Sequence, residues 1–115
     1  MTTNPIKGLS WQEYMALLEQ GLPCDVCGQN ANELHHAIVY RDKNCPEVNH
    51  WINGSPRCRE HHIHSYQDKR KHLNRQVERF GFEEVLKFFE QLPAKKRNRE
   101  VRGMMALVNL ERIER

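Results

Sequence analysis

Residues 58–65, CREHHIHS, decide the fold because they open with a cysteine and a histidine at the spacing of a metal-binding pair. Cys58 and His61 form C-x-x-H, and Cys24 and Cys27 form C-x-x-C within LPCDVCGQN, a stretch rich in turn-forming residues. Zinc prefers four tetrahedral Cys and His ligands, and two such pairs can enclose one ion. We therefore expect these side chains to hold a structural zinc ion, since a closed set of protein ligands leaves no position open for a substrate.

The metal-like spacing of the cysteines argues against the alternative of two disulfides in a secreted domain. Cys45, in KNCPE, stands apart from both pairs and is expected to be a free thiol. The 115 residues allow one small domain, and contents of 38% hydrophobic and 29% charged residues suit a soluble globular protein. There is no apolar run of about 18 residues and no charged-then-apolar leader. We expect a cytoplasmic protein with its start intact and no membrane partner.

The formal charge of +3 is unevenly divided along the chain. Residues 1–56 carry three Lys/Arg and six Asp/Glu, a net of −3, and residues 57–102 carry thirteen and seven, a net of +6. A basic second half suits a face that binds a polyanion such as DNA, and it equally suits a solvated helical surface. If DNA binds, phosphate contacts that weaken with salt would come from cations of this half. These are Arg57, Arg59, Lys69, Arg70, Lys71, Arg75 and the cluster at 95–102.

Local patterns predict a short series of elements. Ser10 and Glu13 form a capping box for a helix that Gly21 should end. ELHHAIVY, residues 33–40, reads as a strand, and a weak return strand is expected around Trp51 and Ile52. These elements predict a β-hairpin that follows an N-terminal helix.

The second half should be helical. A helix is expected over residues 59–79, with Ile63, Tyr66, Leu73 and Val77 as inward positions. Gly81 should break it, FEEVLKFFEQL should form a second helix ended by Pro93, and KKRNREVRGMMALVNLERIER a last one. Aromatic residues are expected in the core, and His50 and His72 on the surface. The aromatic residues are Trp11, Trp51, Phe80, Phe82, Phe88 and Phe89.

The remaining histidines are unexplained by the zinc site. His62 cannot easily share the ion of His61, because neighbouring helical residues point about 100° apart. His35 and His36 lie in LHH, where a regular strand sends adjacent side chains to opposite faces. If the strand is irregular there, or one ring reaches around its edge, His35 and His62 could hold a second ion together with water and substrate oxygens. His36 would then be free to act as a base.

These residues together resemble the zinc-stapled branch of the HNH endonucleases, of the small phage and prophage type. The resemblance covers roughly residues 22–66 and is carried by ligand spacing. The second zinc pair is Cys-x-x-His here rather than Cys-x-x-Cys. The matching residues are Cys24, Cys27, Leu34, His35, His36, Asn53, Cys58, His61 and His62.

The resemblance implies a small α+β fold, the ββα-metal or His-Me finger, with added helices at both ends. The implied parts are a leader and helix at 1–21, a zinc-stapled HNH-like core at 22–80, and a helical extension at 81–115 packed on the same domain.

The resemblance also implies roles for individual residues. His36 matches the general base, His35 and His62 match the ligands of a catalytic ion, and Asn53 would orient the base through hydrogen bonds. Asn49 competes with Asn53 for that role, and His64 could replace His62 if the helix begins later.

The implied activity is metal-dependent hydrolysis of DNA phosphodiesters to a 5′ phosphate and a 3′ hydroxyl. A neutral imidazole can accept a proton from water at physiological pH. Two imidazoles hold Mg²⁺ weakly, so Mn²⁺, Co²⁺ or Ni²⁺ should support activity at least as well.

Two other functions fit the sequence. One is a non-catalytic zinc module that binds nucleic acid or protein, and the other is a helical interaction protein with MMALVNL as its binding stripe. The C-terminal helices could also form a homodimer, or simply pack on the domain.

Overall fold

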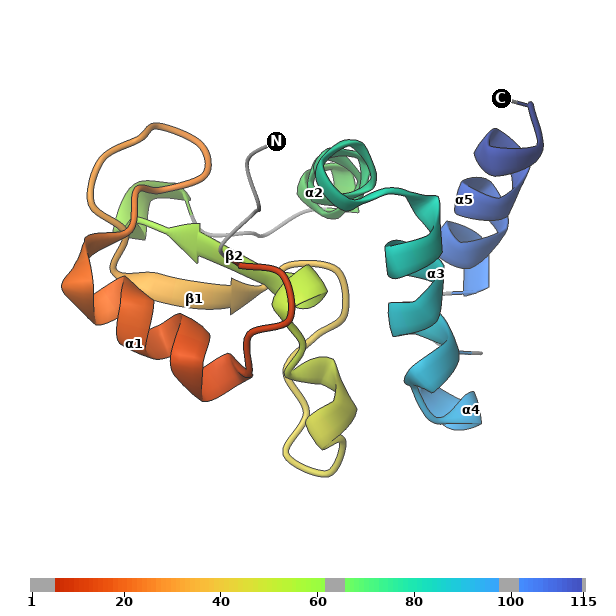
Figure 1. Ribbon diagram of the computed structural model, residues 1–115, viewed down its shortest axis with the longest axis horizontal. Helices are drawn as coiled ribbons and strands as arrows, with labels where there is room; N and C mark the ends of the chain where they lie inside the picture. Colours follow the sequence, from red (N-terminus) through yellow and green to blue (C-terminus); the bar gives the residue numbers. More distant parts are fainter. Residues whose placement is uncertain (1–5, 62–65, 98–101, 115) are drawn as a thin grey trace.

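The computed structural model describes residues 6–61, 66–97 and 102–114 (Figure 1). It is a small α+β protein with a two-stranded antiparallel sheet. The helix α1 and the hairpin lie at one end of the molecule, and α3 and α5 lie at the other, with α2 between them (Figure 1). The helices are α1 Trp11–Gly21, α2 Tyr66–Phe80, α3 Phe82–Gln91, α4 Ala94–Lys96 and α5 Arg102–Glu114, the strands are β1 Glu33–His36 and β2 Gly54–Arg57, and the 3-10 turns are η1 Pro46–Val48, η2 Trp51–Asn53 and η3 Arg59–His61.

The predicted capping box of α1 is confirmed. Ser10 Oγ accepts a hydrogen bond from the Glu13 backbone N–H at 3.1 Å, and Glu13 Oε1 accepts one from the Ser10 N–H at 2.9 Å. Both otherwise unpaired donors of the first turn are thereby satisfied. Gly21 ends the helix with a φ of 110°, a left-handed conformation that glycine adopts without steric cost.

The hairpin is confirmed, but both strands differ from the prediction. β1 ends at His36 rather than at residue 40, because the Ile38 and Val39 backbone N–H groups donate to the side chain of Asn53 and not to a neighbouring strand. The return strand is Gly54–Arg57, and the expected strand residues around Trp51 form a 3-10 turn instead. The two strands pair in the register Glu33↔Arg57, Leu34↔Pro56, His35↔Ser55 and His36↔Gly54.

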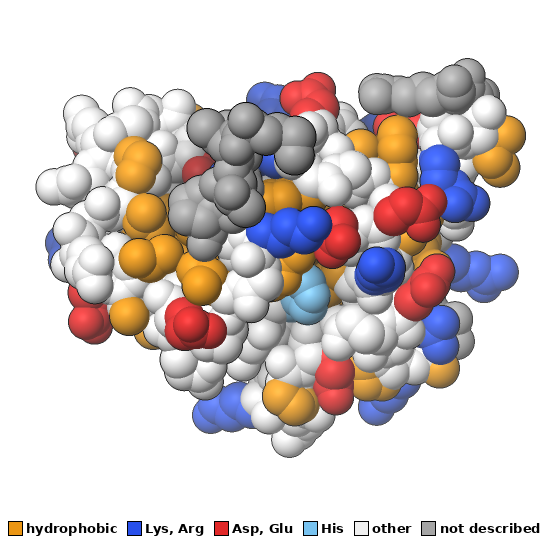
Figure 2. Space-filling model, viewed as in Figure 1, with side chains coloured by type: hydrophobic (Ala, Val, Ile, Leu, Met, Phe, Trp, Pro, Cys, Tyr) orange, Lys and Arg blue, Asp and Glu red, His pale blue; other side chains and the backbone are white. Residues whose placement is uncertain are grey.

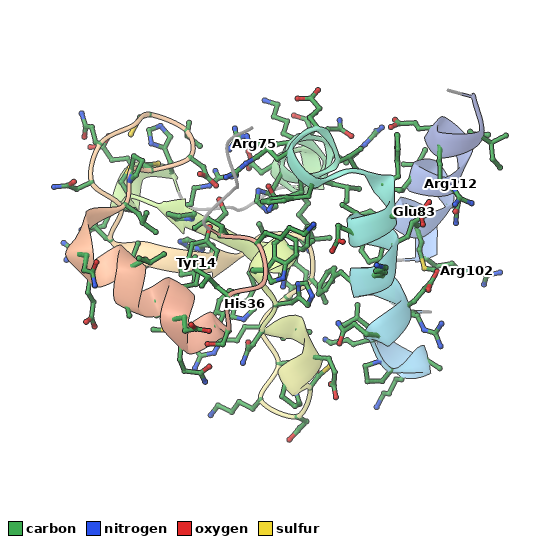
Figure 3. The ribbon with its side chains drawn as sticks, viewed as in Figure 1. Tyr14, His36, Arg75, Glu83, Arg102 and Arg112 are labelled. Carbon is green, nitrogen blue, oxygen red and sulfur yellow. The ribbon has the colours of Figure 1, made fainter. Side chains whose placement is uncertain are left out.

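The helical half follows the predicted order. The helix expected over 59–79 is described as η3 and α2. Of its expected inward positions, Leu73 and Val77 are buried, and Ile63 and the side chain of Tyr66 lie outside the described residues. Gly81, with a φ of 90°, separates α2 from α3 as predicted. Within the described residues the expected last helix is represented by α4 and α5, and α5 is joined to α3 by an ion pair of 3.0 Å between Arg112 Nη1 and Glu83 Oε1 (Figure 3).

One core contains buried side chains from Ile6 to Val108, so the C-terminal helices share it with the hairpin loop and α1. The predicted core aromatics are buried or packed against this core. The surface prediction for two histidines is wrong. His72 is 1% exposed on the buried face of α2, and half-buried His50 packs its ring against Phe88 with centroids 5.0 Å apart.

No helix in the described parts of the chain is long and apolar enough to cross a lipid bilayer.

Candidate functional site

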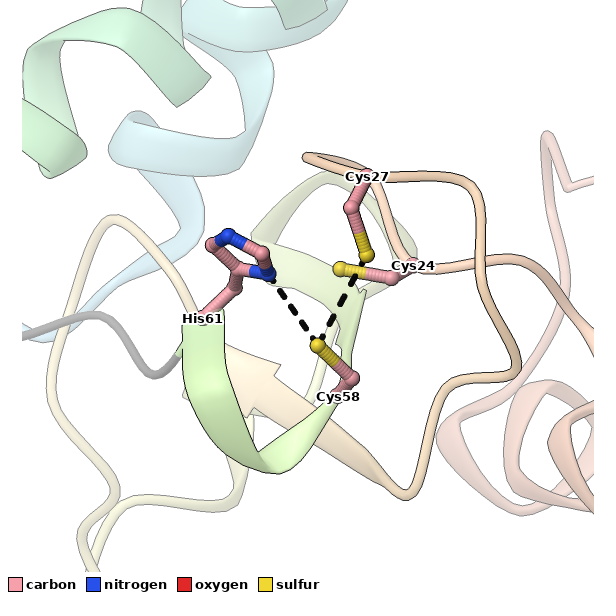
Figure 4. A group of neighbouring side chains, drawn as sticks. All are labelled: Cys24, Cys27, Cys58 and His61. Atoms are coloured by element: carbon pink, nitrogen blue, oxygen red, sulfur yellow. Dashed lines mark hydrogen bonds between the residues drawn. The ribbon is translucent and has the colours of Figure 1, made fainter.

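The predicted metal ligands come together in one cluster (Figure 4). Cys24 and Cys27 lie in the loop between α1 and β1. Cys58 directly follows β2, and His61 is the last residue of η3. Their ligand atoms all lie within 4.8 Å of one another. The cluster therefore brings together two segments of the chain whose nearest ligands, Cys27 and Cys58, are 31 residues apart in the sequence.

The spacing of the sulfur atoms fits a zinc ion. Cys27 Sγ and Cys58 Sγ are 3.8 Å apart, and Cys58 Sγ lies 3.1 Å from His61 Nδ1. Sulfur atoms bound to a tetrahedral zinc at about 2.3 Å lie about 3.8 Å apart, whereas a disulfide would bring them to about 2.05 Å. The cluster could hold a metal such as zinc, with His61 coordinating through Nδ1.

Backbone donors around the cluster favour a thiolate. Burial raises the pKa of the Cys24 thiol, but backbone N–H groups of Cys58, Cys27 and Val26 outweigh burial and lower that pKa to about 6. The Val26 N–H lies 3.4 Å from Cys24 Sγ. A thiolate is the form that binds a metal ion.

Cys45 lies outside the cluster, as predicted. It is 4% exposed, and its thiol donates to Glu47 Oε2 at 3.2 Å. Burial and the Glu47 carboxylate raise the pKa of this thiol. Cys45 is therefore kept neutral within the core and does not complete the metal site.

Arg57 ties the cluster to the hairpin and does not reach solvent. Its side chain donates through Nε to Ser55 Oγ at 2.7 Å and through Nη1 to the His61 carbonyl at 3.4 Å. Ser55 Oγ in turn donates to Asp25 Oδ2 at 2.7 Å, and Arg75 Nη1 from α2 lies 3.6 Å from the same carboxylate oxygen. At 4% exposure, Arg57 cannot serve as the predicted DNA contact.

The other cations predicted to bind DNA divide into two groups. Lys69 is 7% exposed, with its ammonium 3.1 Å from the centroid of the Tyr40 ring, so it too is not a surface cation. Arg59, Arg70 and Lys71 are exposed, and Arg75 is half-buried. Figure 2 shows Lys/Arg and Asp/Glu side chains interspersed over the helical side of this face rather than gathered in one basic patch.

His36 lies at the end of β1, held between a helix and a loop. Its ring stacks on Trp11 of α1, with centroids 4.4 Å apart and planes 23° apart, and Figure 3 shows it on the α1 side of the hairpin. Its Nε2 lies 2.7 Å from Asn49 Oδ1. Since an amide oxygen only accepts, Nε2 carries the proton and Nδ1 keeps a free lone pair.

The environment of His36 favours the neutral imidazole. Burial lowers its pKa most, the hydrogen bond that its Nε2–H donates to Asn49 opposes this, and the positive charge of Arg41 lowers the pKa further. The net direction is below the ordinary histidine value near 6.5. A ring that is neutral at pH 7 can accept a proton.

The two candidate asparagines have different roles. Asn49 contacts the His36 ring directly. Asn53 is fully buried: its Oδ1 accepts from the Ile38 and Val39 N–H groups at 2.7 and 2.9 Å, and its Nδ2 donates to the Val39 and Val48 carbonyls at 3.0 and 2.9 Å. Asn53 thus fixes the loop that carries Asn49 and acts on His36 only through the backbone.

The expected ligands of a second ion are placed only in part. His35 Nε2 lies 3.1 Å from Glu33 Oε2, and these side chains share one face of β1 because they are two residues apart. A carboxylate is a usual partner for the ring nitrogen that a metal-binding histidine does not use to coordinate its ion. His62 and its alternative His64 lie outside the described residues.

An open hollow of about 470 Å³ runs along β1 and contains both strand histidines. The strand therefore exposes His35 and His36 to one space although adjacent side chains of a strand face opposite sides. The residues around it are Met15, Leu18, Asn32, Glu33, Leu34, His35, His36 and Arg41.

Three contributors to this site were absent from the sequence prediction or had another role in it. Trp11 was expected only in the core, Asn49 only as a competitor, and Arg41 not at all. Arg41 follows the buried run Ala37–Val39 and exposed Tyr40. The signal in the sequence that could have indicated Arg41 is its position as a cation just after this apolar run.

Comparison of the chain with family models, curated proteins and solved structures gave no significant match.

Proposed function

We propose that this protein is a metal-dependent DNA endonuclease of the HNH type, built on a ββα-metal finger. The observation that supports it most directly is the placement of His36. It is a half-buried histidine on an open hollow, neutral at pH 7, whose Nε2 is fixed by Asn49 so that Nδ1 is the available base. A zinc module that is purely structural requires only its ligands and not this arrangement.

The order of the elements also supports the proposal. A hairpin is followed by η3 and α2, and the Cys/His cluster fixes the point where the hairpin leads into these elements. In the sequence, His36, Asn53 and His62 match the three residues that name the HNH family, as the resemblance implies. Asn53 would be a positioning residue, since its bonds hold the loop and not the reacting atoms.

In the proposed reaction, His36 Nδ1 takes a proton from the attacking water. The imidazolium that forms is stabilised by the hydrogen bond from Nε2–H to Asn49 Oδ1, and stacking on Trp11 keeps the ring in place. His35 and His62 would hold the divalent ion, which when bound supplies positive charge to the phosphate and to the leaving 3′ oxygen. Arg59 and Arg70 would contact neighbouring phosphates.

A plasmid-nicking assay with Mn²⁺ tests the proposal. His36→Ala should lower the nicking rate by about 10²–10⁴-fold, the usual contribution of a positioned general base. His36→Phe is the matched control for structure, because it keeps an aromatic ring against Trp11 but has no nitrogen. It should be as inactive as His36→Ala while keeping its bound zinc and its unfolding midpoint.

A second function, a non-catalytic zinc module that binds protein, has one observation in its favour. Two of the six cations named individually as expected DNA contacts, Arg57 and Lys69, are buried against partners of the same chain. Equal nicking by the wild type and both His36 variants, with or without divalent ion, would favour that module and would rule out the endonuclease.

A further inference from the structure

The hollow along β1 has two chemically different walls. Met15 and Leu18 of α1 form an apolar wall, and Met15 is 47% exposed there. His36 and Asn32 contribute polar groups. A volume of about 470 Å³ falls within the range of about 300–1,000 Å³ typical of sites for small organic ligands.

Among the described residues that surround this hollow, Arg41 is the one Lys or Arg. It is exposed, and within the described ranges it has no hydrogen bond or ion pair. Many other cations of the protein are already engaged. Lys96 pairs with Asp42 at 3.1 Å, and Arg112 pairs with Glu83.

The negative charge of the hollow lies at its other end. Glu33 begins β1 and is within 3.1 Å of His35, whereas His36 ends the strand. Three steps along a strand at about 3.3 Å each separate Glu33 from His36 by about 10 Å. The Glu33 carboxylate is directed to the His35 ring, whereas Arg41 follows His36 in the chain, so the backbone positions of His36 and Arg41 lie on the side away from Glu33.

We propose that Arg41 is the phosphate-binding side chain of the hollow, which seats a nucleic-acid phosphodiester beside His36 with the adjoining sugar and base against Met15 and Leu18. This inference rests on the proposed endonuclease function and deepens it. It also assigns phosphate binding to an exposed cation, Arg41, rather than to Arg57 and Lys69, which are buried.

The chemistry of arginine suits this role. Its planar guanidinium can donate two parallel hydrogen bonds to the non-bridging oxygens of one phosphate, which a lysine ammonium cannot do. The same charge would stabilise the additional negative charge of the phosphate during hydrolysis. The apolar wall would remove part of the nucleotide from water, as apolar surfaces in ligand sites do. Arg41 would thus be a binding and catalytic residue.

The test is an NMR titration at pH 8 without divalent ions, which records the ring signals of His36 and the backbone signals of Asn32. The ligands are a thymidine dinucleotide and inorganic phosphate. The dinucleotide should shift these signals in the wild type and bind at least tenfold more weakly to Arg41→Ala, with partial recovery in Arg41→Lys. Lys43→Ala, an exposed cation two residues further along the same loop and outside the hollow, should bind like the wild type.

The two ligands separate the parts of the site. Met15→Ala should weaken binding of the dinucleotide but not of inorganic phosphate, because only the nucleotide reaches the apolar wall. Inorganic phosphate that binds as tightly as the dinucleotide would overturn the assignment to nucleic acid. Equal dinucleotide affinity in Arg41→Ala and the wild type would overturn the role of Arg41.

Failure of this inference is distinguishable from failure of the proposed function. If the wild type nicks DNA but Arg41→Ala binds the dinucleotide normally, the endonuclease stands and the role of Arg41 is wrong. If the wild type never nicks DNA, yet the dinucleotide signals depend on Arg41, the nucleotide site stands and the catalytic proposal is wrong.

Discussion

Replacing Asn53 with alanine should destabilise the fold strongly, whatever its effect on catalysis. The Asn53 amide is fully buried and makes hydrogen bonds to backbone groups of Ile38, Val39 and Val48. Alanine would leave these groups without the partner that closes the loop between the strands. At about 1 kcal/mol for each hydrogen bond, the loss is on the order of 4 kcal/mol. The whole domain is stable by only about 5–15 kcal/mol.

Urea unfolding followed by circular dichroism would measure this loss, and two further variants make it specific. Asn53→Asp keeps an acceptor for the Ile38 and Val39 N–H groups but loses both donors and buries a charge, so it should be at least as unstable as Asn53→Ala. Asn49→Ala removes one exposed side-chain bond and should cost less than about 1 kcal/mol.

The nicking assay should distinguish the two asparagines in another way than stability does. Asn49→Ala should remain folded and reduce nicking, because His36 loses the acceptor that fixes its tautomer. Asn53→Ala should regain part of its activity at low temperature, where more of it is folded. A loss of stability below about 1 kcal/mol for Asn53→Ala would refute the reasoning, since the loop would then be held by other contacts.

Three further outcomes are expected. Cys58→Ser should abolish stoichiometric zinc binding, measured by elemental analysis, and EDTA should lower the unfolding midpoint of the wild type but not of this variant. Burial lowers the pKa of His72 to about 3 from its ordinary value near 6.5, so only the unfolded chain takes up this proton between those values. Stability should therefore fall by about 2 kcal/mol from pH 7 to pH 5, and His72→Leu should remove that part of the slope in urea unfolding. Gly54→Ala would place a methyl group 2.8 Å from Tyr14 Cε2 and 3.2 Å from Trp11 Cζ3, so it should displace α1 and reduce both stability and nicking. An unchanged unfolding midpoint in Gly54→Ala would show that α1 moves away at no cost.

Features with strong local signals could be predicted from the sequence. The capping box of Ser10 and Glu13, the helix ends at Gly21 and Gly81, and the Cys/His spacing all depend on chemistry within a few residues. The zinc cluster was predictable because its ligand types and spacings constrain one ion regardless of the rest of the fold.

Features set by distant contacts could not be predicted. GSPR has weak strand propensity, with a glycine and a proline, and it forms β2 because Gly54 lets Tyr14 approach and because the Pro56 carbonyl accepts from the Asp25 N–H at 2.9 Å. The end of β1 depends on the Asn53 side chain. The burial of Arg57 depends on Ser55 and on the His61 carbonyl.

The hairpin register also separates the metal cluster from the proposed chemistry. Arg57, next to Cys58, pairs with Glu33 at one end of the hairpin, and Gly54 pairs with His36 at the other. Three strand steps at about 3.3 Å place the two ends about 10 Å apart. An ion in the cluster is therefore too far from His36 to bind the water that this histidine would deprotonate. Any dependence of nicking on added Mn²⁺ must then come from a second ion, and it should persist in protein whose cluster is already filled with zinc.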